Sequence, residues 1–229
     1  MTTTTSGTEA VWQRIAPVYE DVLAHPFLTG ITDGSLPRAA FARYVVQDGL
    51  YLREYARSLS LCAARGIDTD TVEMFASHAS VAVQVERSLH NDLLRGLDLD
   101  PDELAAIPPS PTCAAYTNFI KQACALGERH EAIAAVLPCY WIYHQVGHTL
   151  IEAGSPDPVY QRWIDTYADE TFAQSVRGAL AACDAVAADL GPVATQEMTT
   201  AALTAARYEW MFWDSAFNDE RWPSLGNAA

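Results

Sequence analysis

Apolar residues recur every three or four positions along most of the chain, which is the spacing of one face of a helix. The segment that starts at Thr8 is typical, with Val11, Ile15, Val18 and Val22 on one face. Strict alternation of apolar and polar residues, which would indicate a half-buried strand, is not sustained over several residues in any segment. We therefore predict an all-α fold, a single-domain bundle of about eight helices.

Proline, glycine and capping residues divide this pattern into segments. Residues 27–37 are rich in turn-forming residues and predict a loop, and a break near Asp169 separates two late helices. The predicted helices lie near residues 8–25, 37–66, 69–97, 113–126, 131–153, 157–168, 170–190 and 192–218. We expect a disordered tail at residues 1–7, one helical domain at 8–218 and a C-terminal tail at 219–229.

The chain of 229 residues carries 29 acidic and 14 basic residues, a formal net charge of −15. This balance argues against binding to nucleic acid or to an anionic membrane. The first ten residues lack the features of a secretory signal, and no apolar run approaches the ~18 residues of a membrane span. Five widely spaced cysteines without a C-x-x-C motif favour a reduced protein, so we expect a cytoplasmic location.

Candidate chemistry begins in the run AVLPCYWIYHQVGH, residues 135–148. Cys139 directly follows Pro138, and a proline inside a helix removes a backbone donor and bends the turn before it. Tyr143 lies one turn further on the same face. A thiol and a phenol beside such a bend could line a pocket, although a free cysteine is usually a small apolar core residue. Residue type alone leaves both interpretations open.

Two acids stand in strongly apolar helical stretches. Asp48 must either be paired, for example with Arg43, Arg53 or a tyrosine, or contact a ligand, because an isolated buried charge is costly. Glu209 lies in the aromatic half of the last helix, where burial would raise its pKa and suit it to donate a proton. Together with Cys139 and several inward-facing tyrosines, these acids suggest a site for a flat, nitrogen-rich heterocycle.

The spacing of the histidines bears on whether the chain binds a metal. His144 and His148 are four residues apart and could share a helix face. The chain lacks the Glu-x-x-His motif of di-iron bundles, and HQVGH lacks the glutamate of H-E-x-x-H. We therefore predict no metal site and no cofactor. A haem bundle with His25 or His148 as the proximal ligand stays open as an alternative.

The chain resembles the TenA family, also called thiaminase II or aminopyrimidine aminohydrolase. Five segments carry this resemblance in the family's order: DGLYL at 48–52, YTNFI at 116–120, LPCYWIY at 137–143, YQRWIDTYADETF at 160–172 and YEWMFW at 208–213. The resemblance implies a haem-oxygenase-like fold without haem, and a homotetramer. It implies cleavage of the methylene substituent of 4-amino-2-methylpyrimidines in thiamin salvage. The better substrate is 4-amino-5-aminomethyl-2-methylpyrimidine, and thiamin is the slower one.

The resemblance also implies roles for individual residues. Cys139 matches the nucleophile, Glu209 the acid/base, and Asp48 the carboxylate that holds the pyrimidine. The positions that line the pocket or pack on the ring match Tyr51, Tyr116, Tyr143, Tyr167 and Phe212. His144 and Gln145 depart from the family pattern and would alter substrate preference if they pointed inward. A metal- or haem-dependent oxidase and a non-enzymatic regulator are the alternative functions.

Overall fold

The computed structural model describes residues 6–92 and 106–224, and the side chains within these ranges except those of residues 86–92. In this part the chain forms nine helices and no strand, which confirms the predicted all-α class. The helices are α1 (Gly7–Leu23), α2 (Pro26–Asp33), α3 (Arg38–Ala64), α4 (Thr69–Asp92), α6 (Pro111–Leu126), α7 (Arg129–Leu150), α8 (Pro158–Ala168), α9 (Glu170–Ala187) and α10 (Pro192–Phe217). None of these described helices combines the length and apolarity that a membrane crossing requires.

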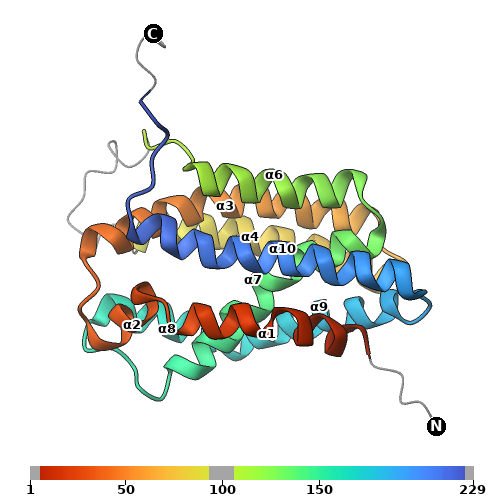
Figure 1. Ribbon diagram of the computed structural model, residues 1–229, viewed down its shortest axis with the longest axis horizontal. Coiled ribbons are helices and arrows are strands. Elements are labelled where there is room, and N and C mark those ends of the chain that lie inside the picture. Colours follow the sequence, from red (N-terminus) through yellow and green to blue (C-terminus); the bar gives the residue numbers. More distant parts are fainter. Residues whose placement is uncertain (1–5, 93–105, 225–229) are drawn as a thin grey trace.

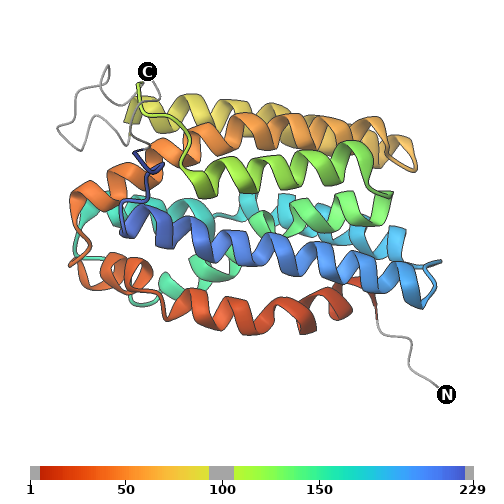
Figure 2. The same cartoon turned by 45° about the horizontal axis from the view of Figure 1, so that its top comes forward.

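The helices form two layers with α7 passing between them (Figure 1). The long helices α3, α4, α6 and α10 run side by side, and α1, α2, α8 and α9 make up the other layer (Figures 1 and 2). Helix α7 packs against α10, α9, α6 and α8, and residues 132–138 within it are all buried. This continuous apolar run explains the central position, because a helix that is hydrophobic on all sides is stable only when it is enclosed.

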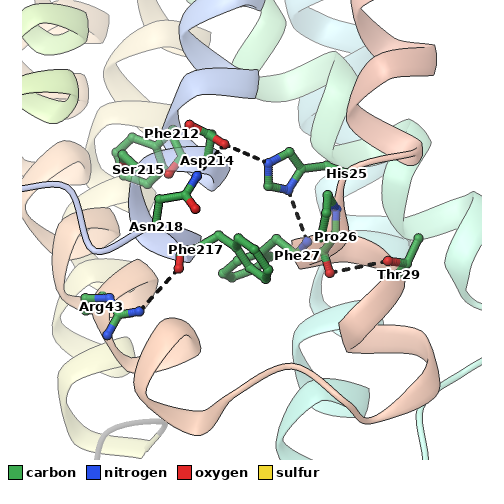
Figure 3. A network of polar contacts seen from close by, with 10 residues as sticks. All are labelled: His25, Pro26, Phe27, Thr29, Arg43, Phe212, Asp214, Ser215, Phe217 and Asn218. Atoms are coloured by element: carbon green, nitrogen blue, oxygen red, sulfur yellow. Dashed lines mark hydrogen bonds and ion pairs between the residues drawn. The ribbon is translucent and has the colours of Figure 1, made fainter.

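Helix α2 corrects the loop predicted at residues 27–37. His25 caps this helix, since its Nδ1 accepts a hydrogen bond of 3.0 Å from the backbone N–H of Phe27 (Figure 3). Pro26 occupies the first turn, where its missing N–H costs nothing. Gly34 ends the helix at φ 78°, a conformation that favours glycine. The turn-forming residues thus mark the ends of a short helix whose apolar side is buried.

The first helix begins one residue earlier than predicted. The hydroxyl of Ser6 caps it by accepting from the backbone N–H of Glu9 at 3.1 Å. Thr8, where the predicted helix starts, donates from its backbone and hydroxyl to Asp184, at 2.8 and 3.0 Å. Residues 1–5 of the tail predicted at 1–7 lie outside the described residues. So do residues 93–97 of the third predicted helix.

Part of the C-terminal tail predicted at residues 219–229 packs on the helical body. Glu220 accepts hydrogen bonds of 2.9 and 3.0 Å from the backbone and hydroxyl of Thr112, in the first turn of α6. The indole of Trp222 donates to the carbonyl oxygen of Pro109 at 2.9 Å. Residues 225–229 lie outside the described part, so a single domain at 8–218 stays a prediction.

Candidate active site

A cavity of about 130 Å³ lies between α3, α4, α7, α8 and α9. Four predicted site residues line it: Asp48 from α3, Cys139 and Tyr143 from α7, and Tyr167 from α8. Asp48 and Cys139 are 91 positions apart along the chain. Most of the other described lining residues are aliphatic or aromatic. The fold therefore brings a thiol and a carboxyl group together in a largely apolar enclosure.

Cys139 is only half-buried, although it lies on the central helix, because it lines the cavity. Burial raises the pKa of its thiol well above the usual value, and the negative charge of Glu209 raises it further. The neighbouring hydroxyls of Tyr51 and Tyr55 lower that pKa and oppose part of the shift. The thiol is therefore neutral near pH 7, and a base must take its proton before the sulfur can attack a substrate.

Glu209 lies behind the cavity wall and is not part of its lining. It is buried on α10, and the hydroxyl of Tyr116 on α6 donates to its Oε1 at 2.6 Å. Burial raises the pKa of Glu209 to about 8; the hydrogen bond from Tyr116 lowers it, and the charge of Asp48 raises it. Glu209 therefore holds a proton near neutral pH and is close enough to Cys139 to influence its ionisation. This combination suits a general acid.

Asp48 is buried at the cavity, and burial raises its pKa to about 7. Arg43, one of its predicted partners, instead donates to the carbonyl oxygens of Ala216 and Phe217 at 2.9 and 3.5 Å. A carboxyl group that titrates near neutral pH can either accept or donate a hydrogen bond. Such a group suits a ring nitrogen next to an amino group, which offers an acceptor and a donor side by side.

The tyrosines beside Asp48 are held in place by hydrogen bonds between side chains and by the close approach of α7 and α8. The hydroxyl of Tyr44 donates to that of Tyr143 at 3.2 Å and accepts from the indole of Trp163 at 3.2 Å. The rings of Tyr143 and Tyr167 lie 4.7 Å apart. This approach requires Gly147, because a Cβ atom there would lie 2.5 Å from the backbone carbon of Tyr167. One glycine on α7 thus allows α8 to bring its tyrosine to the cavity.

Tyr51 and Phe212 form part of the packing behind the wall. The ring of Tyr51 lies 5.0 Å from that of Tyr116 and 5.7 Å from that of Phe212. The hydroxyl of Tyr51 is buried and has no partner at ordinary hydrogen-bond geometry among the described residues, although it lies near enough to Cys139 to lower the pKa of the thiol. A buried hydroxyl without a partner is unusual and is available to a thiol or a bound ligand.

Comparison with known proteins decides the family. Residues 12–219 match the model of the TENA/THI-4/PQQC family. The chain belongs to this family. It is 35% identical over 204 residues to the aminopyrimidine aminohydrolase of Bacillus subtilis (strain 168), covering 89% of this chain and 86% of that protein. It is 34% identical to the aminopyrimidine aminohydrolase of Halalkalibacterium halodurans, covering 93% of this chain and 96% of that protein. The resemblance to TenA is thereby confirmed.

Solved structures agree on the fold of this TENA/THI-4/PQQC chain. A TenA homologue from P. horikoshii OT3 superposes with a TM-score of 0.84 at 23% identity, covering 93% of this chain and 99% of that one. A domain with a heme oxygenase-like fold from Shewanella denitrificans superposes with a TM-score of 0.72 at 13% identity, covering 90% of each chain. The predicted haem-oxygenase-like bundle is therefore confirmed.

The cavity of this family member also includes residues that sequence analysis did not assign to the site. Tyr55 and Trp163 line it and lie on the helix faces of Asp48 and Tyr167, so helical spacing could have identified them. Tyr160 lies one turn before Trp163 on the same face of α8, but its side chain points away from the cavity. Its hydroxyl donates to the carbonyl oxygen of Leu36 at 2.7 Å. The spacing of residues along one helix therefore does not by itself predict which of them line the cavity.

Further lining residues depend on contacts between distant helices. Nδ1 of His78 on α4 lies 3.0 Å from the hydroxyl of Tyr140 on α7, and both residues line the cavity. No local pattern marks His78, because only the packing of α4 places it there. His144 and Gln145 are not part of the described lining; the ring of His144 lies 4.4 Å from that of His148.

The two histidines considered as haem ligands are placed differently. Nδ1 of His25 accepts from the backbone of Phe27, and its Nε2 lies 3.4 Å from Oδ1 of Asp214, so both nitrogens are engaged (Figure 3). His148 is exposed and does not line the cavity. Across the described residues, no group of three or more His, Cys, Asp or Glu side chains is arranged to hold a metal ion. Neither histidine fits the role of a proximal haem ligand at this cavity.

Proposed function

We propose that the chain is an aminopyrimidine aminohydrolase. It hydrolyses the C–N bond at the methylene group of 4-amino-2-methylpyrimidines and acts in thiamin salvage. Its substrate is 4-amino-5-aminomethyl-2-methylpyrimidine, with thiamin as a slower one. The observation that carries the proposal is that Asp48 and Cys139 line one cavity, while Glu209, buried and protonated near neutral pH, is close enough to affect the pKa of Cys139. The names of the relatives from B. subtilis and H. halodurans support the same activity.

The pyrimidine ring binds at the Asp48 end of the cavity. The carboxyl group of Asp48 pairs with a ring nitrogen and the neighbouring amino group, which together present one acceptor and one donor. The rings of Tyr143 and Tyr167 pack against the heterocycle. A proton from Asp48 to the ring nitrogen makes the ring more electron-poor, which assists attack by a nucleophile.

In the first step the sulfur of Cys139 adds to the electron-poor ring. Glu209 first gives its proton to the amine nitrogen, and the carboxylate so formed takes the proton of the thiol as the sulfur adds; the C–N bond then breaks and ammonia leaves. The ring then carries an exocyclic methylene group and a C–S bond. In the second step water attacks the methylene carbon and the C–S bond breaks. Glu209 gives its proton to the departing sulfur and takes one from the water, and the ring nitrogen returns its proton to Asp48. The sum is one water consumed, and one hydroxymethyl pyrimidine and one ammonia formed.

The remaining predicted residues support this chemistry. Tyr116 holds the Glu209 carboxyl group in position, and Tyr51 offers its hydroxyl to the sulfur or to the substrate. Phe212 packs against Tyr51 and keeps water from this region. We further propose, from the resemblance to TenA, that the protein is a cytoplasmic homotetramer. Sedimentation of the purified protein tests the assembly.

The decisive experiment follows ammonia and hydroxymethyl pyrimidine in buffer without added metal. The wild-type protein should form both from the aminomethyl pyrimidine, and Cys139→Ser should lose at least ~1,000-fold in kcat. Cys183→Ala is a matched control, since this cysteine is buried in α9 and does not line the cavity. Full activity of Cys139→Ser would overturn the assignment of the nucleophile. Absence of turnover by folded wild-type protein would overturn the proposed function.

A further inference from the structure

The cavity is elongated along α3. Asp48, Leu52, Tyr55 and Leu59 all line it, at the spacing of a single helix face. Asp48 and Leu59 are 11 residues apart, which corresponds to about 16 Å along a helix. A pyrimidine ring at the Asp48 end therefore leaves much of this length free.

The opposite wall at the far end comes from α4, which packs along α3 (Figure 2). Its lining residues are His78, Val81, Ala82 and Val85, again on one helix face. We name the space between these four residues and Tyr55 and Leu59 the α3–α4 arm. Val81 is 46% exposed, so the arm lies close to the protein surface.

One polar pair interrupts the aliphatic surface of the arm. Nδ1 of His78 lies 3.0 Å from the hydroxyl of Tyr140, and the ring of Tyr140 lies 5.9 Å from that of Tyr55. Burial lowers the pKa of His78, so the imidazole is neutral at pH 7. A neutral imidazole and a phenol can each donate or accept a hydrogen bond. The arm therefore presents an uncharged hydrogen-bonding pair among apolar side chains.

Cys139 lies on α7 one turn before Tyr143, which lines the Asp48 end of the cavity. Tyr140 also follows Cys139 directly in α7. A substrate held at Asp48 and attacked at Cys139 thus has its far side toward the arm.

We propose that the α3–α4 arm binds the departing part of the substrate, and that His78 and Tyr140 are specificity-determining residues for it. This inference rests on the proposed function. The α3–α4 arm selects aminomethyl pyrimidines whose amine nitrogen carries a short, uncharged substituent with one hydrogen-bonding atom. A charged substituent is disfavoured, because the described lining residues of the arm offer no opposite charge. The C–N bond breaks as before, water supplies hydroxyl to carbon and hydrogen to nitrogen, and a primary amine leaves in place of ammonia.

The test compares kcat/KM for two probes, the aminomethyl pyrimidine and its N-(2-methoxyethyl) derivative. Tyr140→Phe and His78→Leu should each lower the ratio of derivative to parent roughly five- to tenfold, as expected for the loss of one hydrogen bond. Ala82→Leu fills the arm and should lower the ratio further. Tyr19→Phe makes the same chemical change as Tyr140→Phe but away from the cavity, where the hydroxyl bonds Thr149 at 2.8 Å, and should leave the ratio unchanged.

Thermal melting of each variant verifies folding before the ratios are compared. If the wild-type protein hydrolyses the parent but not the derivative, the inference is wrong and the proposed function stands. The same holds if the ratio is equal in wild type, Tyr140→Phe and His78→Leu. If the folded wild-type protein hydrolyses neither probe, both the proposed function and this inference are contradicted.

Discussion

The hydroxyl of Tyr116 donates a hydrogen bond of 2.6 Å to Oε1 of Glu209, with both side chains almost completely buried. This bond joins α6 to α10 at the back of the cavity. A buried carboxyl group with one hydrogen bond is poorly solvated as an anion, which explains why its pKa rises to about 8 despite the tyrosine. Glu209, the proposed acid, is therefore protonated near neutral pH before any substrate binds.

Replacing Glu209 with Gln keeps the shape of the side chain and its ability to accept from Tyr116, but removes the proton. We expect kcat for the aminomethyl pyrimidine to fall by a factor of about 100 to 10,000, the usual contribution of a general acid. Steady-state assays of ammonia release measure this loss. Glu197→Gln on the same helix is the control, because its side chain is half exposed to solvent and does not line the cavity. Equal activity of the two variants would contradict the role of Glu209.

The raised pKa of Glu209 also predicts how stability depends on pH. Its ordinary pKa is 4.5 and its pKa in the folded protein is about 8, so between these values the folded state holds a proton that the unfolded state releases. The contribution of Glu209 to the free energy of unfolding therefore falls as pH rises through this window. Urea unfolding of wild type and Glu209→Gln at pH 5 and pH 8.5 measures it. The variant should gain stability relative to wild type at the higher pH; an equal difference at both values would contradict the prediction.

Tyr116→Phe removes the hydrogen bond that lowers the pKa of Glu209. The pKa should rise further, so the fall of kcat at alkaline pH should move to higher pH in this variant, and the rate at neutral pH should drop because the carboxyl group is held less firmly. A pH–rate profile measures both effects. Tyr208→Phe is a suitable comparison, since its ring stacks on Tyr116 at 5.3 Å while its hydroxyl is not bonded to Glu209. A pH–rate profile unchanged from wild type would show that this hydrogen bond does not determine the pKa of Glu209.

Gly147→Ala tests the contact that brings Tyr167 to the cavity. The added Cβ would lie 2.5 Å from the backbone carbon of Tyr167, so α7 and α8 must separate. We expect a loss of roughly 1–3 kcal/mol in stability from overpacking, together with a higher KM. Gly191→Ala is the matched control, because nothing lies within 4 Å of the added atom there. Thermal melting and steady-state kinetics of the two variants distinguish the clash at Gly147 from the general cost of replacing a glycine with alanine.

Sequence patterns predicted the helices well where they are long and amphipathic. Asp169 marked the boundary between α8 and α9, where its side chain accepts from the backbone of Thr171 at 2.7 Å. Helix α2 escaped prediction because Thr29 and Gly30 are poor helix formers. That helix depends on capping by His25 and on burial of Phe27, and both involve tertiary context.

The candidate site was predicted in part. The resemblance pointed to Asp48 and Cys139, which line one cavity, and to Glu209, which lies behind it. The roles of all three stay predictions. Which groups face the cavity and which stand behind its wall depends on helix rotation within the bundle, and a sequence does not fix this rotation. The contact of His78 with Tyr140 joins residues 62 positions apart and follows only from the way α4 packs along α3, which brings His78 to α7.

The segment after α10 has a consequence for where the chain can be shortened. Glu220 supplies the acceptor for the first turn of α6, the helix that carries Tyr116 one turn later. A truncated version ending at Phe217 would leave the N–H of Thr112 without its acceptor and would remove the indole of Trp222 from Pro109. Trimming for crystallisation or the fusion of an affinity tag should therefore leave residues 219–222 intact.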